Sequence, residues 1–266
     1  MATPTILALD FDGVLCDGLL EYFETSWRAY CQLFKPADTT PPPGLAERFY
    51  PLRPVIETGW EMPMVLYGLL QGVKDEDILD HWADIVPGLL QTTGLEWPQV
   101  MATVDGLRDR WIQSDPDSWL DLQRFYPGVL ARVQQAIDAG VDTVIISTKE
   151  GRFIAAMLQR AGMTFPRDRI FGKEVQQPKT ETLRQVIADF SIPDATPPRV
   201  WFIEDRYKTL NKVKAEPDLQ DITLFLGDWG YNTAAERDSA RRDDRIHLLS
   251  LAQLVQGFDS WVTPQS

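Results

Sequence analysis

The sequence predicts an α/β fold, in which a parallel sheet flanked by helices is interrupted by a second, mostly helical domain. Two observations lead to this prediction. From Tyr126 onward, short apolar runs alternate with amphipathic segments, which is typical of strands joined by helical crossovers. One further apolar run lies near the N-terminus, and the long stretch between these regions has helical periodicity. We therefore expect a core of residues 1–17 and 126–266, with residues 18–125 inserted as a separate domain.

The composition narrows the class of protein. The 266 residues suffice for two domains at the usual size of about 150 residues each, and 44% of them are hydrophobic. A net charge of −13 argues against a nucleic-acid partner, because such proteins need a basic surface. No apolar run reaches the roughly 20 residues of a membrane span, and the N-terminus lacks the pattern of a signal peptide. Two cysteines are too few for a disulfide framework, so we expect a cytoplasmic protein.

The first predicted strand ends in two carboxylates. The apolar run Ile6–Leu9 is followed by Asp10 and Asp12, and then by Gly13. Residues i and i+2 of an extended chain point to the same side, so the two carboxylates can converge. Adjacent anions repel one another unless a cation lies between them, and the pair therefore indicates a Mg²⁺ site. The alternative is a strand that ends in an Asx turn.

The predicted insert begins with a helical stripe of large apolar side chains at steps of three and four residues. These residues are Leu20, Phe23, Trp27, Tyr30 and Phe34. Such a stripe predicts core packing, and Lys35-Pro36 is expected to end the helix. Further helices are expected over residues 75–86 and 101–113.

The second half of the chain is expected to supply the rest of the sheet. Pro127-Gly128-Val129 should open a helix that Gly140 ends. The further strands are predicted over residues 141–146, 169–171, 199–203, 222–226 and 246–249. Helices are predicted over residues 152–161 and from Lys179 onward.

Polar side chains follow the central strands where each strand ends. Asp10 and Asp12 follow the first strand, and the other two pairs are Ser147 with Thr148 and Glu204 with Asp205. In a parallel sheet these strand ends share one edge, where such folds bind ligands. Carboxylates, hydroxyls and a lysine in one crevice suit phosphoryl transfer, in which cations neutralise phosphate oxygens while a carboxylate attacks phosphorus.

This arrangement resembles the haloacid dehalogenase (HAD)-like hydrolase superfamily. It is most similar to the phosphatase-like branch with an inserted helical cap, which includes phosphoglycolate phosphatases and β-phosphoglucomutases. The resemblance covers nearly the whole chain and is carried by the sequences of residues 10–14, 144–149 and 126–129, in this order relative to a helical insert. It implies a Rossmann-like parallel core and a cap that closes over the site and selects the substrate.

The resemblance also implies roles for individual residues. Asp10 would be the nucleophile that forms an aspartyl-phosphate, and Asp12 would be the general acid and base. The acid at Asp12 argues against the dehalogenases of the superfamily, which lack it. The implied phosphate-binding residues are Ser147, Thr148 and Lys179. The implied Mg²⁺ ligands are Asp10, Asp12, Asp205 and Glu204, with Asp12 contributing its backbone carbonyl.

Several positions keep two interpretations. The phosphate lysine is either Lys173 or Lys179, and Pro178-Lys179 at the start of a helix fits the family pattern better. Lys149 either reaches phosphate or lies on the surface. No second acid follows Asp205 at the usual distance, so Asp205 is expected to be the direct ligand and Glu204 either a ligand through water or a structural acid. Residues 227–232 either line the site or form an ordinary turn.

The sequence thus predicts a Mg²⁺-dependent phosphatase that hydrolyses a small phosphorylated metabolite. The first alternative is a phosphomutase of the same superfamily, and the second is a catalytically weak member with a regulatory or binding role. We expect no nucleic-acid or membrane partner and either a monomer or a homodimer. No residue of the insert identifies the substrate.

Overall fold

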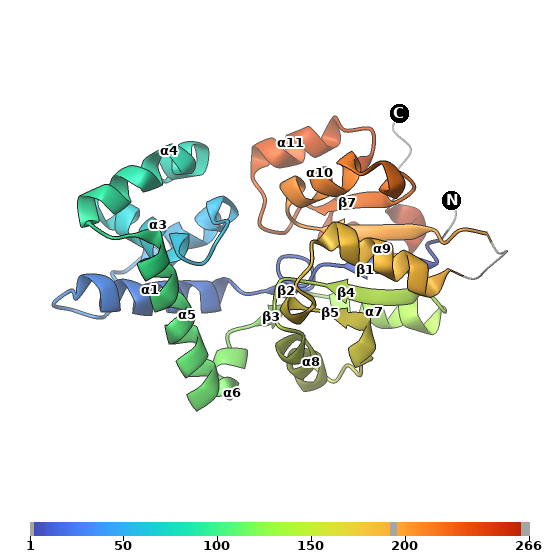
Figure 1. Cartoon of the computed structure of the whole chain (residues 1–266), viewed down its shortest axis with the longest axis horizontal. Helices are drawn as coiled ribbons and strands as arrows, with labels where there is room; N and C mark the ends of the chain where they lie inside the picture. Colours follow the sequence, from blue (N-terminus) through green and yellow to red (C-terminus); the bar gives the residue numbers. More distant parts are fainter. Residues whose placement is uncertain (1–2, 192–195, 262–266) are drawn as a thin grey trace. The chain divides into compact units, whose positions relative to one another are not determined.

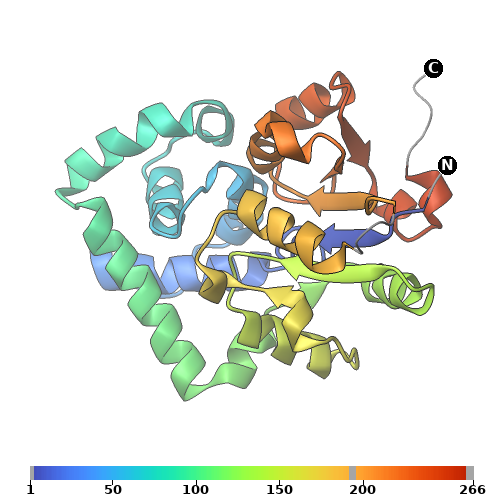
Figure 2. The same cartoon turned by 45° about the vertical axis from the view of Figure 1, so that its right-hand side comes forward.

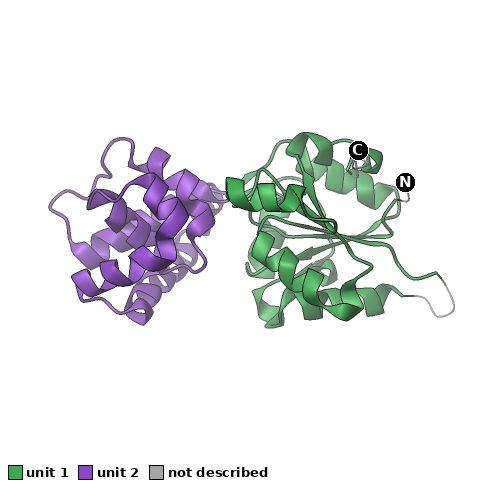
Figure 3. Ribbon diagram, turned by 90° about the horizontal axis from the view of Figure 1, so that it is seen from above, with its two compact units in different colours: residues 1–17, 124–266 green, residues 18–123 purple. Residues whose placement is uncertain are grey.

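The computed structural model describes residues 3–191 and 196–261. The chain divides into two compact units, which Figure 3 colours separately. The core unit comprises residues 1–17 and 124–266, and the insert unit comprises residues 18–123. The first boundary lies where the sequence predicts the insert to begin, and the second lies two residues before the predicted one.

A six-stranded parallel sheet forms the centre of the core unit (Figures 1 and 2). Its strands are β1 (Ile6–Leu9), β4 (Asp142–Ile146), β5 (Ile170–Phe171), β6 (Val200–Glu204), β7 (Thr223–Gly227) and β8 (Ile246–Leu249). Their order is β5-β4-β1-β6-β7-β8, and every neighbouring pair is parallel. All six coincide with predicted strands to within one residue at every end, so the α/β class is confirmed. The first strand of the chain lies in the middle of the sheet.

Helices cover both faces of this sheet (Figure 3). The α-helices of the core unit are α7 (Val129–Asp138), α8 (Gly151–Arg160), α9 (Lys179–Phe190), α10 (Tyr207–Ala215), α11 (Ala234–Arg241) and α12 (Leu251–Leu254). Its short 3₁₀ helices are η2 (Arg167–Arg169), η3 (Lys173–Val175), η4 (Pro217–Leu219) and η5 (Phe258–Ser260). The start of α7 follows the prediction, with Gly128 at φ +79° before it. Gly140, also at φ +79°, lies just after its end.

One face of the sheet packs against α9, α10 and α11. The buried cluster there contains Ala8 of β1 and Phe202 of β6, together with Leu183 of α9 and Leu210 of α10. Side chains alternate between the two faces of a strand. Two residues beyond Ala8 and Phe202 lie Asp10 and Glu204, so the alternation directs both carboxylates toward the face that α9 covers.

The opposite face carries large aromatic side chains. Trp201 of β6 and Phe225 of β7 lie with their ring centroids 5.5 and 5.7 Å from that of Trp261. All three side chains are buried. The core unit therefore has apolar packing on both faces of the sheet, which holds the central strands in place.

The insert unit is helical and has its own core. Its helices are α1 (Leu19–Phe34), α2 (Leu45–Phe49), η1 (Tyr50–Val55), α3 (Glu61–Leu70), α4 (Asp75–Thr93), α5 (Trp97–Ser114) and α6 (Pro116–Leu120). The predicted stripe lies on α1, where Phe23 and Trp27 are buried in a cluster with Phe49 and Leu66. In the residues that the structure describes, no helix is both long and apolar enough to cross a membrane.

A short antiparallel pair of strands lies where the chain leaves and re-enters the core unit. Cys16–Asp17 (β2) pairs with Arg124–Phe125 (β3). This pair was not predicted, because a two-residue strand is too short to show alternation. The pair closes the ends of the inserted segment against each other.

We expect Phe202→Ala to lower the free energy of unfolding of the core unit by about 3–5 kcal/mol, because it leaves a cavity in a packed interior. Phe202 is fully buried between the sheet and its helices. Phe202→Leu keeps most of the volume and should cost less than about 1.5 kcal/mol. Urea unfolding of the three proteins measures both values, and equal stability of the two variants would contradict the packing described here.

Candidate active site

The candidate site lies at the carboxyl ends of β1 and β6, the two central strands. Leu9 and Ile203 are register partners at the ends of their pairing, and the N–H of Asp10 donates to the carbonyl of Ile203 at 2.9 Å. Asp10 is therefore held level with Glu204, the last residue of β6. This is the edge of an open parallel sheet at which ligands are generally bound.

Three acidic side chains meet there. Asp10, Glu204 and Asp205 each bring one carboxylate oxygen to within 4.8 Å of the others. All three residues are buried, with exposed fractions of 7%, 1% and 1%. Buried carboxylates repel one another unless a proton or a cation compensates them. Hard oxygen ligands of this kind suit Mg²⁺, so this donor set fits the metal that the resemblance implies.

Lys179 supplies one positive charge to this cluster. Its Nζ lies 2.8 Å from Oδ1 of Asp10 and 2.7 Å from Oε2 of Glu204. Lys179 is the first residue of α9, the helix that covers the face toward which both carboxylates point. Lys173, the other lysine considered, lies on η3 and is exposed.

The electrostatics of the cluster reflect an excess of negative charge. Burial, followed by repulsion from Glu204, raises the pKa of Asp10 to about 7 despite the attraction of Lys179. Burial also raises the pKa of Glu204, again against the attraction of Lys179. Burial alone would lower the pKa of Lys179, but the two carboxylates overcome it and hold that pKa above its ordinary value. One lysine does not balance three carboxylates, and a divalent cation would.

Asp205 is held in place by two hydrogen bonds from the loop after β7 and by two glycines that lie against it. The N–H of Tyr231 donates to Oδ2 of Asp205 at 2.8 Å, and the amide of Asn232 donates to its backbone carbonyl at 3.0 Å. Gly13 and Gly230 approach from either side. A Cβ on Gly13 would lie 2.2 Å from Oδ2 of Asp205, and one on Gly230 would lie 2.3 Å from its Cβ.

The loop of residues 227–232 therefore supports the site, a question that the sequence left open. Its contacts with Asp205 are made by the backbone N–H of Tyr231, by the side-chain amide of Asn232 and by the absence of a side chain at Gly230. Of these features only the asparagine and the glycine depend on the residue type, and both residue types are equally common in a simple turn. The sequence therefore contained no signal that distinguished the two interpretations.

Asp12 is placed differently from Asp10. Its Oδ1 lies 2.9 Å from Nζ of Lys149, and its carboxylate is not part of the three-residue acidic cluster. It lies near enough to raise the pKa of Asp10, although its effect is smaller than those of burial, Glu204 and Lys179. The site thus contains two separate lysine–carboxylate arrangements, one around Lys179 and one around Lys149.

The segment after β4 contributes polar groups to the same edge. Ser147 is buried, and its Oγ accepts a hydrogen bond from the N–H of Lys149 at 3.2 Å. This contact uses a lone pair and leaves the hydroxyl hydrogen able to donate to an anion. Thr148 is exposed, so its side chain is open to solvent and makes the weaker candidate for a phosphate contact.

Comparison with known proteins gives a fold-level match. No model of a protein family matches the sequence, and no curated protein matches it significantly. Among solved structures, a predicted phosphatase from Clostridium acetobutylicum aligns with a TM-score of 0.55 at 15% identity, covering 96% of this chain and 97% of its own. A candidate phosphoglycolate phosphatase from Lactobacillus delbrueckii subsp. bulgaricus aligns with a TM-score of 0.55 at 13% identity, covering 90% and 92%.

A third structure carries the family name. A candidate haloacid dehalogenase-like hydrolase from Bacteroides fragilis aligns with a TM-score of 0.51 at 20% identity, covering 95% of this chain and all of its own. At these identities the alignments establish the architecture, because both units are covered in each case. The chain therefore has the fold of the haloacid dehalogenase-like phosphatases.

Proposed function

We propose that the protein is a Mg²⁺-dependent phosphatase that hydrolyses a small phosphate monoester through an aspartyl-phosphate on Asp10. The observation that carries this proposal is the buried cluster of Asp10, Glu204 and Asp205 around Lys179. It combines a carboxylate nucleophile, a fixed cation and a donor set for a metal at the edge of the sheet where ligands bind. The acidic balance of the whole chain favours a small substrate over a polyanionic one.

In the first step, an oxygen of Asp10 attacks phosphorus and the bond between phosphorus and the leaving oxygen breaks. Asp12 gives its proton to that oxygen, so the product leaves as a neutral alcohol. Lys179 and the hydroxyl of Ser147 contact the phosphoryl oxygens and stabilise their charge. A bound Mg²⁺, held by Asp10, Asp205, the carbonyl of Asp12 and Glu204, would supply further charge neutralisation.

In the second step, Asp12 takes a proton from water as the water oxygen attacks the phosphorus of the aspartyl-phosphate. The bond between phosphorus and Asp10 breaks, inorganic phosphate leaves and both aspartates return to their starting states. A divalent cation also favours the ionised form of Asp10, whose pKa of about 7 reflects the excess of buried negative charge. The cytoplasmic location and the oligomeric state remain predictions.

Asp10→Asn should abolish Mg²⁺-dependent phosphate release from a panel of phosphorylated metabolites, because an amide cannot form the intermediate. Asp142→Asn is the matched control, since Asp142 begins β4 at the other edge of the sheet and pairs with Arg169 at 3.0 Å. It should keep wild-type activity. Release that persists in Asp10→Asn would refute the proposal. A product that retains its phosphate would indicate a phosphomutase, and binding without turnover would indicate a binding protein.

Lys179→Met should lower kcat/KM by about 10²–10³-fold, because a buried charge that contacts the reacting phosphoryl group is lost. Lys173→Met should leave kcat/KM unchanged, since Lys173 is exposed. Steady-state kinetics on the best substrate of the panel compares them. The reverse order of effects would assign the phosphate lysine to Lys173.

Gly230→Ala should weaken Mg²⁺ binding at least tenfold, since the new Cβ would overlap Asp205 and the backbone oxygen of Gly13. Gly257→Ala makes the same change where a Cβ meets nothing within 4 Å and φ is −67°, so it should bind Mg²⁺ as the wild type does. Isothermal titration calorimetry measures both affinities. Unchanged Mg²⁺ binding in Gly230→Ala would exclude Asp205 as a ligand.

A further inference from the structure

Lys149 is a second partly buried lysine of the site, and the steps proposed above give it no role. Its Nζ lies 2.9 Å from Oδ1 of Asp12, and the side chains of the two residues are only 12% and 16% exposed. The same ammonium lies 5.8 Å from the centroid of the Phe11 ring. A charge pair this far from solvent is screened less than a surface pair, so Lys149 attracts the Asp12 carboxylate more strongly than a surface lysine would.

The backbone of Lys149 is fixed by the segment that follows β5. The N–H of Lys149 donates to Oγ of Ser147 at 3.2 Å, and its carbonyl accepts from the N–H of Lys173 at 3.0 Å. Gly172 permits this approach, since a Cβ there would lie 2.8 Å from the Lys149 carbonyl oxygen and 2.4 Å from the N of Gly151.

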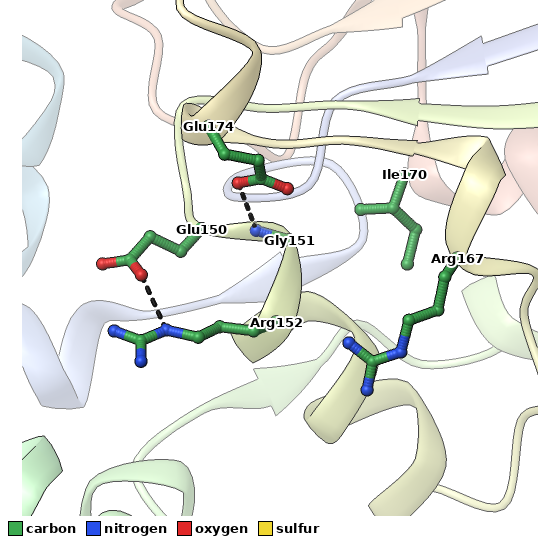
Figure 4. A pocket seen from close by; sticks show the side chains of 6 residues that line it. All are labelled: Glu150, Gly151, Arg152, Arg167, Ile170 and Glu174. Atoms are coloured by element: carbon green, nitrogen blue, oxygen red, sulfur yellow. Dashed lines mark hydrogen bonds and ion pairs between the residues drawn. The ribbon is translucent and has the colours of Figure 1, made fainter.

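Glu174, in the same segment after β5, makes a further contact with the backbone beyond Lys149. Its Oε2 accepts from the N–H of Gly151 at 3.0 Å, an interaction that Figure 4 shows beside a cavity of about 320 Å³. This bond fixes the start of α8, two residues beyond Lys149. The cavity itself is lined by charges that are largely paired or exposed and indicates no ligand. Together, the hydrogen bonds from Lys173 and to Glu174 fix the backbone from which the Lys149 side chain extends.

We propose that Lys149 is the positioning residue for Asp12. The chain places four carboxylates close together, and any of them competes to ligate a divalent cation. A carboxylate that ligates the cation is less able to give or take a proton. Lys149 holds the Asp12 carboxylate outside the cluster of Asp10, Glu204 and Asp205, where it remains free for proton exchange. This inference rests on the proposed phosphatase function.

A positioning role can be separated from phosphate binding by varying the leaving group. An alkoxide is a poor leaving group and depends on protonation by Asp12, whereas p-nitrophenolate leaves without that proton. The ratio kcat/KM reports steps up to phosphoryl transfer to Asp10, so it isolates the step in which Asp12 acts as an acid.

Lys149→Met should therefore lower kcat/KM for alkyl phosphates by about 10²-fold, and for p-nitrophenyl phosphate by less than about threefold. Lys149→Arg restores the charge and should recover most of the loss. In an Asp12→Asn background, Lys149→Met should change kcat/KM for alkyl phosphates by less than about twofold, because its effect passes through Asp12. Lys173→Met is the control for removing a lysine from this neighbourhood and should match the wild type.

Two kinetic outcomes would overturn the inference. An equal fall for all leaving groups, with a raised KM, would make Lys149 a phosphate-binding residue. Additive losses in the double variant would show that Lys149 acts independently of Asp12. Lys149→Gln, which keeps a polar side chain, repeats the test if the methionine variant does not fold.

A wild-type protein with no Mg²⁺-dependent turnover of any ester would refute the proposed function itself, whereas turnover without the leaving-group effect would refute the role of Lys149 alone.

Discussion

The site depends on the burial of three carboxylates around a single lysine. Asp10, Glu204 and Asp205 are taken out of water at the end of two central strands, and Lys179 is the cation that the described structure gives them. Such an arrangement is costly to bury unless the charges are compensated. The raised pKa values of Asp10 and Glu204 express that cost. A cluster of this kind is more readily explained by cation binding than by a contribution to stability.

The sheet and one helix set the geometry of the cluster. The alternation of side chains along β1 and β6 directs Asp10 and Glu204 to the face where α9 packs through Leu183. Lys179 begins that helix, so the same apolar packing that holds α9 on the sheet also places its first side chain over both carboxylates. The position of the Lys179 ammonium is therefore fixed by hydrophobic contacts between α9 and the sheet, outside the acidic cluster itself.

Asp205 is fixed by hydrogen bonds from the loop after β7 and by the close approach of two glycines. Gly13 and Gly230 leave no room for a Cβ, and the N–H of Tyr231 meets the carboxylate directly. Gly13 also has a φ of +81°, a conformation in which other residues are strained. The turn after β1 and the loop after β7 thus close on Asp205 from both sides. Lys149 contacts Asp12 on the other side of the site, and its own backbone is held by the segment after β5.

The sequence by itself determined the class of fold and the edge of the sheet that carries the chemistry. Apolar runs of strand length and helical periodicity are local properties, and all six strands were found from them. The position of Asp10, Ser147, Glu204 and Asp205 at strand ends is likewise local, because parallel strands share one carboxyl edge. The two-residue strands β2 and β3 were not predicted, because so short a segment shows no periodicity.

Tertiary structure alone decided which groups meet. Lys173 and Lys179 have the same chemistry; the family pattern favoured Lys179 at a helix start, but only the packing of α9 shows its contact with Asp10. The contact of Asp12 with Lys149 and the contact of Asp205 with the loop at Gly230 each join segments that are separated in the sequence by at least one whole strand. Such contacts result from the folding of the sheet as a whole, and no local pattern in the sequence encodes them.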